Sequence, residues 1–150
     1  MLNRKAVLRW LKATLVLSGL PLTTATIGSS LPGVPINWGG NELIVLDSKE
    51  FRSEVPKARK RDRKRFAAGV RAILNEDKRP QRAFKKLRKR WNKSACVANN
   101  LAIAYLISED YDGAEAMLVH LKRLRSQCQS NGMRRVLDRN CVTLSYLLST

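Results

Sequence analysis

The sequence has few of the residues that most often perform catalysis or bind metals. Its 150 residues include one histidine, His120, which has no nucleophile or pair of carboxylates beside it. Its three cysteines, Cys96, Cys128 and Cys141, lack metal-ligand spacing and lie too far apart for a CxxC redox motif. We therefore expect a protein that is not an enzyme, with no catalytic residues, no metal site and no cofactor.

Acidic residues are also scarce, 12 against 29 basic residues, which gives a formal net charge of +17 at pH 7. The excess is local, because residues 57–93 hold 17 basic and 3 acidic residues, a net charge of +14. By contrast, residues 94–121 contain no Lys or Arg. The field around so basic a segment attracts nucleic acid, anionic lipid or an acidic protein, and does so less at high salt.

No acidic residue precedes Glu42, and the chain begins in the order of a leader. The basic MLNRKAVLRWLK is followed by the apolar ATLVLSGLPL and then by small polar residues that include Thr23 and Ala25. This order resembles a bacterial-type signal peptide with its cleavage site. The apolar stretch has about half of the ~20 residues that a membrane-spanning helix needs, which favours cleavage. We predict that residues 1–25 are a signal peptide, with an uncleaved anchor left open, and that the protein is exported, periplasmic or membrane-associated.

A mitochondrial presequence is the competing interpretation of the same residues. Lys5, Arg9 and Lys12 would share one face of a helix in a segment without acidic residues. The alternative location is therefore mitochondrial.

Residues 26–56 are expected to form a linker. The stretch SSLPGVPINWGGN is rich in Pro and Gly, which is typical of extended or turning chain. The following ELIVL, residues 42–46, could form a short strand or dock against helices.

From residue 57 onward, the apolar residues follow a helical period, so residues 57–150 are predicted to be a helical domain. A first helix ends near Leu74, and Pro80 suits the first turn of a second. Ser94 is a candidate N-cap for a third helix, and the turn SEDYDG separates it from a fourth. A last helix is expected from about Met133 to Leu148.

The third and fourth helices carry a pattern in which a Leu, a small residue and an aromatic would pack against an aromatic and a small residue. These positions are Asn100, Leu101, Ala102, Tyr105, Tyr111, Gly113 and Ala114. Their spacing resembles a tetratricopeptide repeat over residues 95–128, although Leu121 stands where a small residue is expected and the closing Pro is missing. A weaker echo, NCVTLSYL, begins at Asn140.

The resemblance implies an all-α fold, a short stack of antiparallel helical hairpins after the leader and the linker. Such arrays usually need roughly three repeats, so two pairs and one last helix are expected to be marginal alone. An oligomer is an open alternative.

The first functional hypothesis follows from the resemblance. In peptide-binding tetratricopeptide domains, an Asn at the position of Asn100 binds the backbone of an extended peptide. The resemblance implies the same role here, with Asn99, Ile103 and Leu106 on the same concave surface, unless Asn100 bonds only within its own hairpin. This hypothesis predicts a protein-interaction adaptor whose partner is acidic.

The second hypothesis uses the basic helices. KARKRDRKRF and RAFKKLRKRW each combine cations with an aromatic residue, which suits RNA, another anionic polymer or a lipid surface. The candidate anion-binding residues are Arg59, Lys60, Arg61, Arg63, Lys64, Arg82, Lys85, Lys86, Arg88, Lys89 and Arg90. The alternative is a solvated charged face whose aromatic residues, Phe66, Phe84 and Trp91, belong to the core.

Two cysteines are placed for a candidate disulfide. In an antiparallel hairpin, the start of one helix lies beside the end of the other, which puts Cys96 near Cys128. In an exported protein, a bond between them would stabilise the hairpin by roughly 2 to 4 kcal/mol. The alternative is that both are thiols that pack as small apolar residues.

Overall fold

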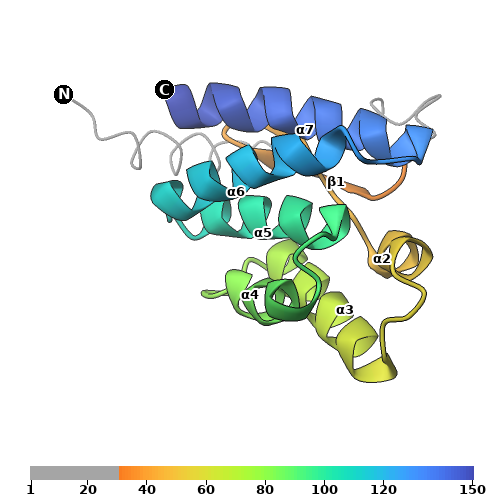
Figure 1. The fold of residues 1–150 in the computed structure, drawn as a ribbon. Helices are drawn as coiled ribbons and strands as arrows, with labels where there is room; N and C mark the ends of the chain where they lie inside the picture. Colours follow the sequence, from red (N-terminus) through yellow and green to blue (C-terminus); the bar gives the residue numbers. More distant parts are fainter. Residues whose placement is uncertain (1–30) are drawn as a thin grey trace.

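A computed structural model describes residues 31–150. The predicted leader, with its cleavage site at Thr23 and Ala25 and its helical face of Lys5, Arg9 and Lys12, lies outside the described residues. Within the described range, the chain forms two strands and six helices (Figure 1). They are β1 (Val34–Trp38), β2 (Asn41–Val45), α2 (Ser48–Glu54), α3 (Lys60–Leu74), α4 (Gln81–Arg90), α5 (Ala95–Ile107), α6 (Tyr111–Arg125) and α7 (Asn131–Ser149).

The helices form a stack in which each packs against the next. Contacts join α3 to α4, α4 to α5, α5 to α6 and α6 to α7, so that α3 and α4 lie at one end and α7 at the other (Figure 1). The predicted helical hairpins are therefore confirmed. The all-α prediction is corrected to a mostly helical fold, because β1 and β2 pair as a small antiparallel sheet.

Burial of helix α5 explains why the first half of residues 94–121 contains no cation. Eleven of its thirteen residues are buried, because neighbouring elements surround it. A helix that is covered on all sides must be apolar all round, so no face is left for a charged side chain. Its start is as predicted, since the Ser94 hydroxyl accepts a hydrogen bond from the backbone N–H of Val97 at 3.1 Å.

The greatest difference from expectation lies in residues 34–54, which are not an extended linker. Gly39 and Gly40 have φ values of 57° and 80°, the left-handed backbone that a two-residue hairpin turn requires, and they join β1 to β2. The predicted strand is present as β2, and it also docks against α5 and α7. The helical domain therefore includes this hairpin and α2, whose buried apolar residues are Trp38, Leu43, Ile44, Val45, Leu46 and Phe51.

The aromatic residues of the basic segment belong to the core. The rings of Phe51 and Phe66 stack with centroids 4.4 Å apart, and Phe84 meets Phe66 edge-on at 5.3 Å. A Cβ at Gly69 would lie 2.6 Å from the Phe84 ring, so a glycine is needed where α3 passes that ring. Over the described residues, no helix is both long and apolar enough to cross a membrane.

Candidate functional site

A cleft between α3 and α4 collects cations from both helices. Its volume is about 380 Å³, and its lining residues are Arg61, Asp62, Arg65, Lys86, Lys89 and Arg90. Four of these cations were expected from the sequence, whereas Arg65 was not. The signal for Arg65 was its position four residues after Arg61, which puts both on one face of a helix.

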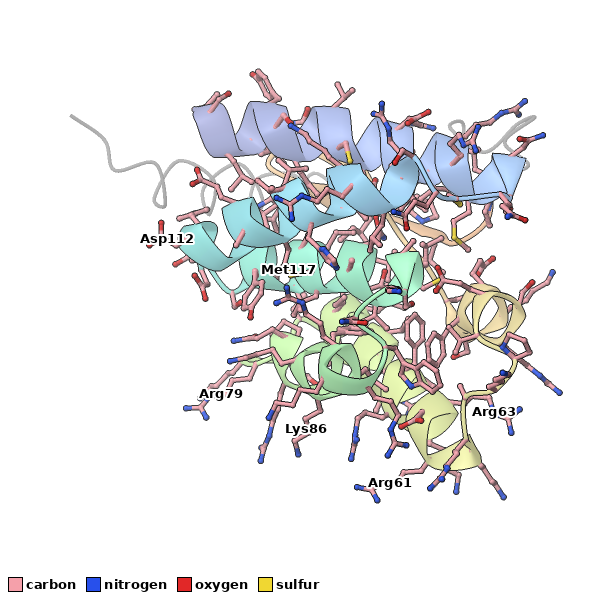
Figure 2. The ribbon with its side chains drawn as sticks, in the orientation of Figure 1. Arg61, Arg63, Arg79, Lys86, Asp112 and Met117 are labelled. Carbon is pink, nitrogen blue, oxygen red and sulfur yellow. The ribbon has the colours of Figure 1, made fainter. Side chains whose placement is uncertain are left out.

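The surrounding surface is basic as well, and we call the exposed basic side chains of α3 and α4 the basic face. Of the eleven candidate residues, ten are exposed and Arg63 is half-buried. Figure 2 shows Arg61, Arg79 and Lys86 pointing away from the helical body at this end of the stack. Among the cleft cations, Arg90 alone forms an ion pair with a residue of the described chain. The others are free to bind an external anion.

Asp62 is a buried carboxylate inside this basic cleft, with 4% of its surface exposed. Its Oδ2 atom accepts hydrogen bonds from the Trp91 indole at 3.2 Å and from the Arg90 guanidinium at 3.4 Å. These bonds tie the first turn of α3 to the end of α4. Within the described chain, the Oδ1 atom of Asp62 has no hydrogen-bond donor.

Two of the peptide-binding candidates, Asn99 and Asn100, bond to the chain's own backbone at Ile44 of β2 and at Leu46, which follows it. Asn99, Asn100, Ile103 and Leu106 are all fully buried. The amide of Asn100 accepts from the N–H of Leu46 at 2.9 Å and donates to its carbonyl at 2.6 Å. Their expected concave surface is therefore covered, and in this structure it is not open to a separate peptide.

Asn140 on α7 makes a second clamp of the same kind, and it was not among the candidates. It accepts from the N–H of Ile44 at 2.9 Å and donates to its carbonyl at 2.7 Å. Asn99 also donates to Ile44 at 3.1 Å and accepts from Asn140 at 2.7 Å. The echo that begins at Asn140 was the signal in the sequence. Three buried amides thus hold β2 and the adjoining Leu46 against α5 and α7.

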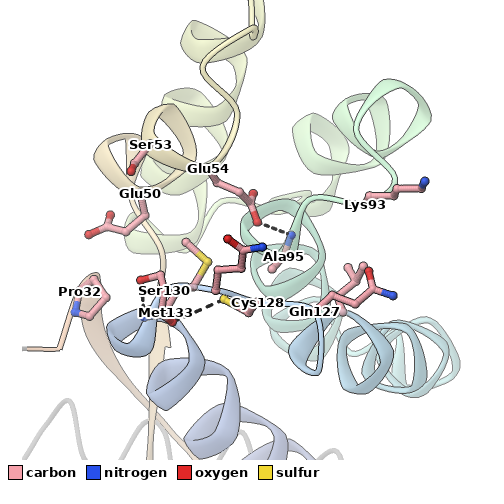
Figure 3. Close-up of a pocket in the computed structure, with 12 residues that line it drawn as sticks. Pro32, Glu50, Ser53, Glu54, Lys93, Ala95, Gln127, Cys128, Ser130 and Met133 are labelled. Atoms are coloured by element: carbon pink, nitrogen blue, oxygen red, sulfur yellow. Dashed lines mark hydrogen bonds between the residues drawn. The ribbon is translucent and has the colours of Figure 1, made fainter.

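A second pocket, of about 490 Å³, lies where α2, the start of α5 and the loop before α7 meet (Figure 3). The Glu54 carboxylate there accepts from the N–H groups of Ala95 at 2.7 Å and Cys96 at 3.3 Å, and from the Ser94 hydroxyl. This carboxylate from α2 satisfies backbone donors at the positive end of α5. Helix capping therefore explains the contacts of Glu54 in this pocket.

The three cysteines are free thiols in this structure, so the candidate bond between Cys96 and Cys128 is not formed here. Burial raises the pKa of Cys96 well above its ordinary value, and the charge of Glu54 raises it further. Burial also raises the pKa of Cys141. The half-buried Cys128 lines the second pocket, and its thiol donates to the Ser130 carbonyl at 3.6 Å.

His120 has a packing role. Its Nε2 atom lies 2.7 Å from the carbonyl oxygen of Asn92, so it links α6 to the loop after α4. Across residues 31–150, no group of His, Cys, Asp and Glu side chains has an arrangement that could hold a metal ion.

Comparison with known proteins gives no match to a protein-family model, to a curated protein or to a solved structure.

Proposed function

We propose that this protein is a binding protein that docks an anionic polymer on the basic face of α3 and α4. The observation that carries the proposal is the cleft between these helices, which has five cations and one carboxylate. Four of the five cations lack an ion pair within the described chain. Like charges held this close repel one another, and an anion that neutralises them gains both attraction and relief of that repulsion.

A polymer suits this face better than a small anion. Helix α3 has 15 residues, which corresponds to a length of about 22 Å. Exposed basic residues lie along this helix and along α4, well beyond the cleft. A small anion would neutralise the cleft alone, whereas a chain of regularly spaced charges can neutralise the whole face and release its own counterions.

The peptide-adaptor hypothesis has less support. Its candidate residues are buried, and a peptide partner would have to displace Ile44 and Leu46, which five hydrogen bonds from the three amides hold in place. An acidic protein would instead have to use the basic face. That case is one outcome of the experiment below.

The test is a titration of the full chain with labelled RNA, with polyglutamate and with phosphatidylglycerol vesicles, at several salt concentrations. Lys86→Glu with Lys89→Glu reverses two cleft charges, and Lys122→Glu with Arg123→Glu reverses two exposed charges on α6 as the matched control. We expect the cleft variant to weaken binding at least tenfold and to lower the slope of log K against log salt by roughly 2.

The control variant should lose much less affinity than the cleft variant. Equal losses in both variants would mean that net charge matters and the face does not. Binding that does not respond to salt would contradict the proposal outright. Capture of polyglutamate alone would identify an acidic protein as the partner.

A further inference from the structure

We infer that the polymer is RNA, and that the free Oδ1 atom of Asp62 accepts a hydrogen bond from a ribose hydroxyl in the cleft. This inference rests on the proposed function, because it names the ligand of the same face. It starts from one carboxylate that does not suit a general anion site.

A cleft that selects anions by charge alone would gain from having no carboxylate at all. Asp62 lowers the positive potential there, and its position within the lining repels a bare phosphate. The bond from Trp91 and the ion pair with Arg90 both use Oδ2, which leaves Oδ1 without a donor within the described chain. A ligand that brings a hydrogen-bond donor beside its phosphate would turn this repulsion into attraction, because bonds to an ionised acceptor are the stronger kind.

RNA carries such a donor in every nucleotide. Its 2′-hydroxyl lies beside the phosphodiester and is the group by which proteins distinguish RNA from DNA. The cleft volume of about 380 Å³ lies in the range of small-ligand pockets, which is enough for one sugar and its phosphate. The cations would hold the phosphate, and Asp62 would hold the hydroxyl.

The rest of the face excludes two other modes of binding. Phe66 and Phe84 are fully buried and Trp91 is partly buried against the core, so this face has no fully exposed aromatic ring on which bases could stack. Leu74, 42% exposed, is the single exposed large apolar residue on α3 and α4, too little to insert into a bilayer. We therefore expect recognition of the sugar–phosphate backbone, with little preference for base sequence.

The first test changes the ligand and leaves the protein intact. Fluorescence anisotropy would compare the affinity of the full chain for a single-stranded RNA, for DNA of the same sequence and for the 2′-O-methyl form of that RNA. We expect RNA to bind roughly tenfold more tightly than either of the other two, since both lack the hydroxyl donor.

The second test changes Asp62. In Asp62→Asn, the amide oxygen must serve the Trp91 N–H, so the NH₂ group faces the cleft and cannot accept from a hydroxyl. We expect RNA and DNA affinities within about twofold of each other, with DNA bound at least as well as by the original protein because a negative charge is gone. Trp91→Phe is the matched control, and it should keep the preference for RNA. Thermal melting by circular dichroism would verify that each variant is folded.

The outcomes separate the two proposals. Equal affinity of the original protein for RNA, DNA and 2′-O-methyl RNA would overturn the role of Asp62 and the choice of RNA, while the anion-binding face would stand. Tighter binding to phosphatidylglycerol vesicles than to RNA would also overturn the inference alone. A protein that binds none of these polyanions in a salt-dependent way would overturn the proposed function and the inference together.

Discussion

At the residue scale, the buried polar side chains of residues 31–150 each have a hydrogen-bonding role. They are Asp62, Ser94, Asn99, Asn100 and Asn140. Asp62 joins two helices, Ser94 caps α5, and the three amides bind the backbone of β2. Burial of a polar group is costly unless it is bonded, so these residues also restrict which elements can lie next to one another.

The thiol of Cys96 predicts a loss of stability in alkali. Its pKa is raised above the ordinary value of 9.0 by burial and then by Glu54, so the folded chain keeps this proton at a pH where the unfolded chain loses it. The resulting stabilisation is fully present below about pH 9 and declines as the pH rises above that value. Urea unfolding at pH 8 and pH 10 would measure this effect. The free energy of unfolding should decline less between these two pH values for Cys96→Ala than for the original chain.

Cys128→Ala provides the control for that comparison, because it removes a half-buried thiol near the same pocket. The free energy of unfolding of Cys128→Ala should decline between pH 8 and pH 10 as much as that of the original chain. An unchanged decline in Cys96→Ala would mean that other groups, such as Tyr105, whose pKa is also raised by burial, cause the alkaline loss.

At the scale of elements, helices α3 to α7 were predictable, whereas β1, α2 and the packing of β2 were not, since they lie in the predicted linker. Helical period and capping signals are local, and they place α3 to α7 close to their observed bounds. The clamps on β2 are not local, since Asn100 and Leu46 are 54 positions apart and Asn140 and Ile44 are 96 apart. The cleft falls between these cases. Its cations could be read from the sequence, but the burial of Asp62 depends on how α3 and α4 pack.

The clamp between α7 and β2 predicts a large cost for Asn140→Ala. This change leaves both the N–H and the carbonyl of Ile44 without their Asn140 partner in a buried site, and only Asn99 still reaches the carbonyl. We expect the free energy of unfolding to fall by about 3 kcal/mol. Denaturant unfolding would measure it, with Asn131→Ala, an exposed position on the same helix, as the control. A loss below about 1 kcal/mol would show that β2 is held by its apolar side chains instead.

At the scale of the whole molecule, charge is concentrated at one end. The segment that carries a net charge of +14 builds α3 and α4, the end of the stack opposite α7. This polarity would orient the protein on an anionic partner with α7 facing away. Val142 and Tyr146, two exposed large apolar residues on α7, would then remain available on the far side.

The location of the protein decides which anion it meets. The predicted leader implies export, where envelope lipids or polymers are the anions, whereas RNA binding requires the cytosol or an organelle matrix. Intact mass and fractionation in the native host would separate these expectations. If the RNA inference holds, we expect either a full-length protein in the cytosol or a protein in an organelle matrix. An extracytoplasmic protein that lacks about the first 25 residues would confirm the signal peptide and contradict RNA as the natural ligand.

The distance along the chain between β2 and α7 has a consequence for biosynthesis. Ile44 leaves the ribosome 96 residues before its anchor Asn140, an interval of roughly 5 to 20 seconds at ordinary rates of translation. Until α7 is synthesised, β2 lacks one of the two helices that cover it. Its apolar side chains are then exposed to aggregation or to chaperones. Premature termination before α7 would make that exposure permanent, because Asn140 would never reach Ile44.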